Sequence, residues 1–248
     1  MDVKYTIRKL ANRLGFDLVK TDNIVRYPPA RRMKLMSSCG IDLIFDVGAN
    51  IGQFAEEIRK LGYKGRIVSF EPLTSAFRVL EKKSAGDPAW EIVNIALGSE
   101  DSKNRINISE NSYSSSILDM MPTHLKADPS SQYIDKEEVT VQRLDSVFDR
   151  YFHEGDRLYL KIDTQGYEKH VIDGAEHSLD KVMCIQMEVS LVPLYDGELL
   201  LVDMIGLMSK KGFFPWALEA EFADPETGQL LQVNTIFVRS GIGDGKKK

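Results

Sequence analysis

The chain has 248 residues, of which 43% are hydrophobic and 28% charged, a composition that is ordinary for a globular protein with a full core. Its 32 basic and 37 acidic side chains give a net charge of −5. This charge gives no electrostatic reason to expect nucleic-acid binding. The two cysteines lack metal-site spacing, which disfavours a zinc site or a disulfide framework. The chain has neither an apolar leader nor an apolar run long enough to span a membrane, so we expect a cytoplasmic protein.

Residues 1–40 predict a small N-terminal helical cap. Apolar residues recur at helical spacing over residues 3–14, and a second short helix is expected over residues 30–39, after Pro28 and Pro29 break the chain. This segment is too short to hold its own core. It therefore either covers a neighbouring cleft or pairs with another subunit, which leaves a homo-oligomer open.

Residues 41–240 predict one α/β domain, because strand-like and helix-like segments alternate along them. Strands are expected over residues 41–47, 66–70, 91–96, 158–162 and 182–189, and helices over residues 53–61, 75–83, 144–151, 167–173 and 199–211. The last two strands, 213–218 and 235–238, are separated by a polar turn and predict an antiparallel pair at the sheet edge.

Two segments depart from this alternation. Residues 98–141 are rich in Ser, Asn and Asp and predict a variable insertion with functional loops, containing a short hairpin near Arg105 and a strand over residues 138–142. Residues 241–248 predict a disordered tail.

The strongest local motif follows the first buried strand. Residues 46–54 read D-V-G-A-N-I-G-Q-F, in which the glycines allow the backbone to turn tightly and to approach a ligand. Glu71 and Pro72 follow the next strand, about 20 positions further on, where an acidic residue binds ribose hydroxyls. The turn lacks the G-x-G-x-x-G pattern of dinucleotide sites. Asp46 opposes a pyrophosphate but suits the ammonium and sulfonium groups of S-adenosyl-L-methionine, so this cofactor is favoured over NAD.

With these motifs in place, the chain resembles the FkbM-type family of S-adenosylmethionine-dependent methyltransferases. The resemblance covers roughly residues 40–240 and rests on an ordered set of motifs: residues 46–54, S-F-E-P at 69–72, N-I-A-L-G at 94–98, S-S-S at 114–116, R-L-D-S-V at 143–147, L-K-I-D-T-Q-G-Y-E at 160–168 and I-F-V-R at 236–239. It implies a class I, three-layer Rossmann-like fold with a sheet of about seven strands, of which the last is antiparallel.

The resemblance also assigns cofactor contacts, residue by residue. It places the cofactor against Asp46, Gly48, Ala49, Asn50, Gly52, Gln53, Glu71, Pro72, Asn94, Ala96, Leu97 and Asp163. Within this set, Glu71 is expected at the ribose, residues 94–97 at the adenine, and Asp163 beside the methyl group. The family often has Glu where this chain has Gln165, which weakens any metal site built from Gln165 and Asp163.

Methyl transfer to a hydroxyl benefits from a general base. Asp163 and Glu188 are the candidates, because each is predicted at the carboxyl end of a strand, where ligands bind in open α/β sheets. The candidates for binding the acceptor are Ser114, Ser115, Ser116, Gln165, His170 and Tyr195. The other histidines, His124, His153 and His177, are expected at the surface.

The favoured function is O-methylation of a hydroxyl on a sugar or glycan precursor or on a small natural product, with S-adenosyl-L-methionine as cofactor and without a nucleic-acid partner. N-methylation of a small molecule or a macromolecule stays open. Two other readings are a nucleotide-dependent dehydrogenase and a catalytically silent Rossmann-like module that binds a partner. The first lacks its glycine motif, and intact cofactor motifs argue against the second.

Overall fold

A computed structural model describes residues 3–241 of the chain, and all but the first residue of the predicted tail at 241–248 lies outside them. The main sheet has seven strands in the order β3-β2-β1-β7-β8-β10-β9. The strands are β1 (Leu43–Val47), β2 (Arg66–Phe70), β3 (Trp90–Val93), β7 (Leu158–Ile162), β8 (Val182–Ser190), β9 (Phe213–Ala223) and β10 (Leu230–Arg239). The first five in this order pair in parallel, whereas β10 pairs antiparallel with both of its neighbours. This arrangement confirms the predicted α/β sheet with a reversed last strand.

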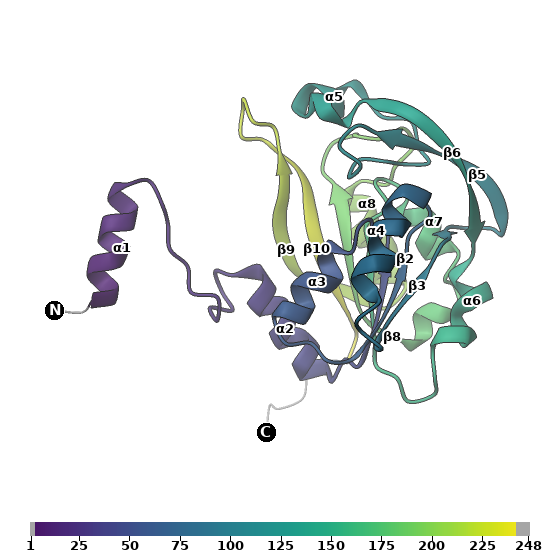
Figure 1. Ribbon diagram of the computed structural model, residues 1–248, viewed down its shortest axis with the longest axis horizontal. Coiled ribbons are helices and arrows are strands. Elements are labelled where there is room, and N and C mark those ends of the chain that lie inside the picture. The colour runs from purple at the N-terminus through teal and green to yellow at the C-terminus, as the bar shows by residue number, and fades with distance from the viewer. Residues whose placement is uncertain (1–2, 242–248) are drawn as a thin grey trace.

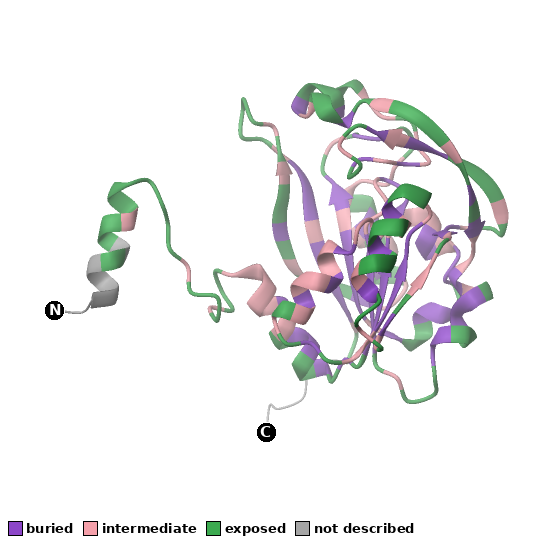
Figure 2. Ribbon diagram, in the orientation of Figure 1, coloured by how far each residue is buried: buried purple, intermediate pink, exposed green. Residues whose placement is uncertain are grey.

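Helices cover both faces of the sheet, so the domain has three layers (Figure 1). One face packs on α2 (Pro28–Cys39), α3 (Gln53–Lys60) and α4 (Thr74–Ser84), and the other on α6 (Leu144–Tyr151), α7 (Glu168–Asp173) and α8 (Leu201–Lys210). Alternate residues of a strand supply the two faces: Phe45 packs in one core and Ile44 in the other. Because both faces are buried, the central strands read as continuous apolar runs. Figure 2 shows this buried centre.

The predicted N-terminal cap divides into two parts. Helix α2 packs on the sheet through Leu35, Met36 and Cys39, and it begins at the two prolines that were expected to precede it, because proline is compatible with a first helical turn. Helix α1 (Val3–Arg13) stands away from the sheet (Figure 1), and its Leu10 side chain is exposed. Only α2 therefore covers the domain as a cap would.

The insertion forms a second, three-stranded sheet in the order β4-β6-β5. Its strands are β4 (Ala96–Leu97), β5 (Ser102–Ser109) and β6 (Tyr133–Gln142), and the connection between β5 and β6 carries α5 (Pro122–Ala127) and a short 3-10 helix, η1 (Pro129–Ser131). The single strand expected over residues 91–96 is wrong: β3 ends at Val93, and Ala96 pairs with Val141 of the insertion. The chain thus leaves one sheet and enters the other within three residues.

The two cysteines, distant in sequence, meet in the core between α2 and the sheet. Cys39 of α2 and Cys184 of β8 are both free and buried, with their Sγ atoms 3.8 Å apart. No helix within residues 3–241 combines the length and the apolar character needed to cross a membrane.

Candidate active site

A cavity of about 940 Å³ opens at the carboxyl ends of the central parallel strands, the edge at which open α/β sheets bind ligands. It lies under the insertion and beside the β9–β10 hairpin. Its lining residues come from the predicted turns (Gly48, Asn50, Gln53, Glu71, Pro72, Ala96, Leu97, Asp163, Gln165), from the insertion (Asn111–Ser115, His124, Asp128) and from the far strands (Gln186, Glu188, Glu219–Phe222, Gln232, Asn234).

The glycine turn after β1 is built for close approach of backbone. Gly48 has φ +74°, and a Cβ atom there would lie 1.9 Å from the carbonyl oxygen of Asp163. The amides of Gly48 and Ala49 both donate to the carbonyl of Phe70, at 3.0 and 3.1 Å. Only glycine combines this conformation with this contact, so the turn can sit against the end of β7. Ala49 and Gly52, predicted cofactor contacts, support the turn from behind and do not line the cavity.

Glu71 ties the two neighbouring βα turns together. Its Oε2 accepts from the amide of Asn50 at 2.7 Å, and its Oε1 accepts from the amide of Leu73 at 2.8 Å. Burial raises the pKa of Glu71 to about 7, against the lowering effect of these two hydrogen bonds. Glu71 still lines the cavity, and each carboxylate oxygen keeps a lone pair for a ligand hydroxyl.

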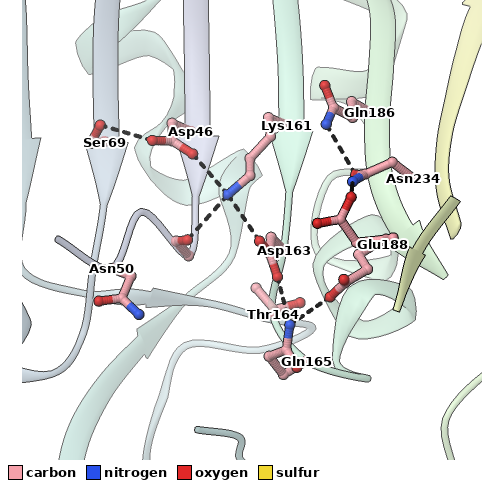
Figure 3. A network of polar contacts seen from close by, with 12 residues as sticks. Asp46, Asn50, Ser69, Lys161, Asp163, Thr164, Gln165, Gln186, Glu188 and Asn234 are labelled. Atoms are coloured by element: carbon pink, nitrogen blue, oxygen red, sulfur yellow. Dashed lines mark hydrogen bonds and ion pairs between the residues drawn. The ribbon is translucent and has the colours of Figure 1, made fainter. Parts of the chain in front are cut away.

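Asp46 does not line the cavity, which corrects the expectation that it faces the cofactor. It is fully buried, and its Oδ1 lies 3.1 Å from Nζ of Lys161, while Ser69 donates to its Oδ2 at 3.3 Å. Lys161 also lies 3.4 Å from Oδ2 of Asp163 (Figure 3). Burial lowers the pKa of Lys161, but the two carboxylates raise it overall above its ordinary value. The charge of Asp46 is therefore balanced inside the protein.

Asn94 is a second corrected contact. Its side chain donates to the carbonyls of Glu71 at 2.9 Å and Pro72 at 3.0 Å, so it braces the turn after β2 and is not part of the cavity wall. Ile95, Ala96 and Leu97 do line the wall, at the point where the chain passes from β3 to β4.

The two candidate bases meet through Gln165. Its Nε2 donates to Oδ1 of Asp163 at 2.8 Å and to Oε2 of Glu188 at 2.6 Å, as Figure 3 shows. Burial first, and then the neighbouring Asp163 and Glu221 carboxylates, raise the pKa of Glu188 well above its ordinary value. Both carboxylates and the amide line the cavity. The two predicted bases, Asp163 and Glu188, thus lie close together, and Gln165 bridges them. Gln165 is the residue at which the family often has Glu.

The serine run divides in the structure. Ser114 and Ser115 line the cavity, whereas Ser116 is buried and donates from Oγ to the carbonyl of Gln165 at 2.6 Å. Tyr195 lies outside the wall and donates to Oε1 of Gln165 at 2.7 Å. Ser116 and Tyr195 therefore support Gln165 from behind and have no direct access to an acceptor.

Two histidines lie where the other was expected: His124 lines the cavity and His170 does not. His170 does not line the cavity; its ring stacks on Tyr167, with centroids 4.0 Å apart and planes 5° apart. His124, expected at the surface, is 3% exposed, lines the cavity and packs edge-on to Tyr195. Burial lowers the pKa of His124 to about 4, so its ring is neutral at pH 7. His153 and His177 are exposed, as predicted.

Sequence reasoning missed the carboxylates at the far side of the cavity. Glu219 and Glu221 lie on β9, and Glu221 accepts from Nδ2 of Asn234 at 2.7 Å. No motif marked them, since they are ordinary residues of an edge strand. Alternation along a strand that follows the cavity edge was the only signal that could have found them. Lys161 was also missed, although a lysine within an apolar strand (L-Y-L-K-I) is unusual enough to indicate a buried partner.

The cavity fits S-adenosylmethionine at the end bounded by the two turns. Phe70, Leu73, Ile95 and Leu97 give it an apolar wall suited to a purine, and Glu71 offers acceptors to ribose hydroxyls. The carboxylate of Asp163 faces the same end, where it suits a sulfonium cation. Gly48 lets the turn pack directly against the Asp163 carbonyl, which keeps these two walls of the cavity together.

The sequence profile of the Methyltransferase FkbM domain matches residues 46–215, which is more than half of the chain. No curated protein sequence matches the chain. The match to the FkbM profile confirms both the predicted family resemblance and the predicted cofactor, S-adenosylmethionine.

Several solved structures are similar to the chain at low sequence identity, each with a TM-score below 0.5. A methyltransferase FkbM from Methylobacillus flagellatus is 13% identical, with a TM-score of 0.46, over 79% of this chain and 43% of that one. This chain therefore spans less than half of the Methylobacillus protein. A putative RNA methyltransferase from Pyrococcus horikoshii is 11% identical, with a TM-score of 0.46, over 93% and 96%. A putative tRNA methyltransferase from Streptococcus pneumoniae, solved with S-adenosyl-L-methionine, is 10% identical, with a TM-score of 0.45, over 84% and 72%.

With the sheet order, the glycine turn, Glu71 and the sequence profile in agreement, this chain belongs to the FkbM family of S-adenosylmethionine-dependent methyltransferases.

Proposed function

We propose that this protein transfers a methyl group to a hydroxyl of a sugar, a glycan precursor or a small polyhydroxylated natural product. One observation carries the proposal: the carboxylate of Glu188 stands in the cavity wall with a raised pKa and one oxygen, Oε1, without a partner among the described residues. A carboxylate with a raised pKa is a stronger proton acceptor than an ordinary one. Removal of a proton is what a hydroxyl acceptor requires and what a neutral amine requires less.

The far side of the cavity favours an acceptor with many hydroxyl groups. Carboxylates and amides line it, namely Glu188, Glu219, Glu221, Gln186, Gln232 and Asn234. Ionised carboxylates only accept hydrogen bonds, so they suit the hydroxyl donors of a sugar.

The chain's own residues divide the work. Glu71, Asp163 and the backbone of residues 48–50 would hold the cofactor, which when bound supplies an electrophilic methyl group on sulfur and leaves as S-adenosylhomocysteine with the electron pair of the broken C–S bond. Glu188 takes the hydroxyl proton on Oε1 as the oxygen lone pair forms the new C–O bond. The insertion lines the cavity through Asn111–Ser115, His124 and Asp128.

Mass spectrometry tests this proposal. The protein would be incubated with S-adenosylmethionine carrying a labelled methyl group and with panels of sugars, nucleotide-linked sugars, natural-product alcohols, amines and RNA. We expect label in a methyl ether, and its loss in Glu188→Gln. Label on nitrogen alone would contradict the O-methylation proposal. A folded protein that binds no S-adenosylhomocysteine in calorimetry would point to a silent binding module.

A further inference from the structure

Gln165 makes hydrogen bonds to four other residues of the protein. It lies in the turn after β7 with φ +53°, a left-handed conformation that is uncommon for a residue other than glycine. Its Nε2 donates to Asp163 and Glu188, its Oε1 accepts from Tyr195, and its backbone carbonyl accepts from Ser116. Every polar atom of the side chain is thus engaged within the protein.

The orientation of the amide follows from its two carboxylate neighbours, and Tyr195 holds the other end of the amide. Its hydroxyl, on a side chain that is 1% exposed, lies 2.7 Å from Oε1 of Gln165 and 3.3 Å from the carbonyl of Ser114. Ionised carboxylates can only accept hydrogen bonds, so the amide nitrogen must face Asp163 and Glu188 and the amide oxygen must face the phenol. A flipped amide would place its oxygen against two carboxylates, whereas the phenol can donate or accept; the carboxylates therefore set the orientation, and the Tyr195 hydroxyl donates to Oε1.

The consequence falls on Glu188. Its Oε2 accepts the amide hydrogen at 2.6 Å, whereas Oε1 has no partner among the described residues. Protonation at Oε2 would weaken this hydrogen bond, because a hydroxyl oxygen is a poorer acceptor than a carboxylate oxygen, so proton uptake is favoured at the other oxygen. We propose that Gln165 is a positioning residue that occupies Oε2 of Glu188 and thereby assigns proton uptake to Oε1, and that Tyr195 holds Gln165 in the orientation this requires.

This inference depends on the proposed function only in naming the acceptor hydroxyl as the source of the proton. The charged groups around Glu188 are Asp163 at the end of β7, Glu221 on β9 and Glu168 on α7, all of which raise its pKa. Among these neighbours the Gln165 amide is the group that acts in the opposite direction, because it stabilises the ionised form.

Carbon-13 NMR of the glutamate carboxyl groups tests the inference without cofactor, acceptor or catalysis. The Glu188 signal, assigned by its loss in Glu188→Gln, would be titrated in the wild type and in Gln165→Met, which keeps the side-chain length and removes both donors. We expect its titration midpoint to rise by about one pH unit in Gln165→Met, and to rise further in Gln165→Glu. Tyr195→Phe should give a smaller rise, and the exposed Gln229→Met none. An unchanged midpoint in Gln165→Met would overturn the inference.

Folding of the variants is controlled separately. Gln165→Asn retains an amide and tolerates the left-handed conformation, but it is one methylene shorter and cannot reach both carboxylates; we expect it to fold and to raise the Glu188 midpoint. If the midpoint moves as expected but no alcohol is methylated, the proposed function fails and the role of Gln165 stands. If alcohols are methylated and the midpoint does not move in Gln165→Met or Gln165→Asn, the positioning role fails alone.

Discussion

The two halves of the cavity are built in different ways. The cofactor half comes from two consecutive βα turns, in which Gly48, Asn50 and Glu71 lie within 25 residues of one another and are joined through backbone amides. The acceptor half comes from the turn after β7, from β8, from the insertion and from the β9–β10 hairpin, and it is joined through side chains. Backbone geometry fixes the first half, and side-chain chemistry fixes the second.

This difference teaches where each half tolerates change. A backbone site depends on conformations that few residues adopt, so single substitutions in its turns should act on binding of the cofactor. A side-chain site depends on charges and hydrogen bonds, so substitutions there should act on rate and on pH dependence.

Gly48→Ala should have the largest effect. Its Cβ atom would meet the Asp163 carbonyl at 1.9 Å, in a backbone conformation that disfavours alanine. We expect calorimetric binding of S-adenosylhomocysteine to be lost and stability to fall by about 3 kcal/mol or more. Gly197→Ala is the matched control, because Gly197 has the same φ of +74° with nothing within 4 Å; it should cost about 1 kcal/mol and leave binding intact. Equal effects of the two variants would break the division.

Glu188→Gln should be the most damaging change in the acceptor half. Without the proton acceptor, the rate of methyl transfer should fall by about 10²–10⁴-fold, while the affinity for S-adenosylhomocysteine stays near that of the wild type. Steady-state kinetics and calorimetry on the same preparation separate the two effects. In the wild type, the rate should rise with pH as Glu188 ionises, above the ordinary glutamate range because its pKa is raised. A pH-independent rate would contradict the assignment of Glu188 as base.

Glu168 offers a test on stability. Burial raises its pKa to about 8, and its Oε1 accepts from the amide of Thr164 at 2.8 Å. The folded state therefore binds a proton that the unfolded state has released between about pH 4.5 and 8, so stability falls as pH rises through this window. One pKa unit corresponds to about 1.4 kcal/mol, so the loss should reach a few kcal/mol. Urea unfolding at pH 5, 6.5 and 8 should show a shallower decline in Glu168→Gln; parallel declines would contradict this origin.

Glu71→Ala should have the smallest of these effects. Loss of a carboxylate that bonds ligand hydroxyls should weaken S-adenosylhomocysteine binding by about 10- to 100-fold. The maximal rate at saturating cofactor should change little, since Glu71 lies away from Glu188 at the other end of the cavity. The exposed Glu176→Ala serves as the control in calorimetry and kinetics. A large fall in maximal rate with unchanged affinity would contradict the assignment of Glu71 to the cofactor half of the cavity.

Helices and strands were predicted correctly where a short run of neighbouring residues defines their ends. The strands at 66–70 and 158–162 and the helix at 144–151 have the predicted bounds, because each is a short apolar or amphipathic run with clear ends. The strand at 91–96 was predicted too long, because Ala96 is apolar like its predecessors but belongs to the second sheet. Nothing in the local pattern distinguishes a strand that continues from one that changes partner.

The sequence by itself determined the α/β order of elements, the family and the two βα turns that carry Gly48 and Glu71 at the cavity. These depend on hydrophobic periodicity and on glycine and acidic residues at fixed spacing, which are properties of neighbouring residues. Only the tertiary structure decided that Asp46 pairs with Lys161, that His124 is buried at the cavity, and that Gln165 lies between Asp163 and Glu188. Each of these outcomes depends on the approach of segments distant in the chain, and on the free energy of burying a charge or a polar group, which the tertiary partners determine.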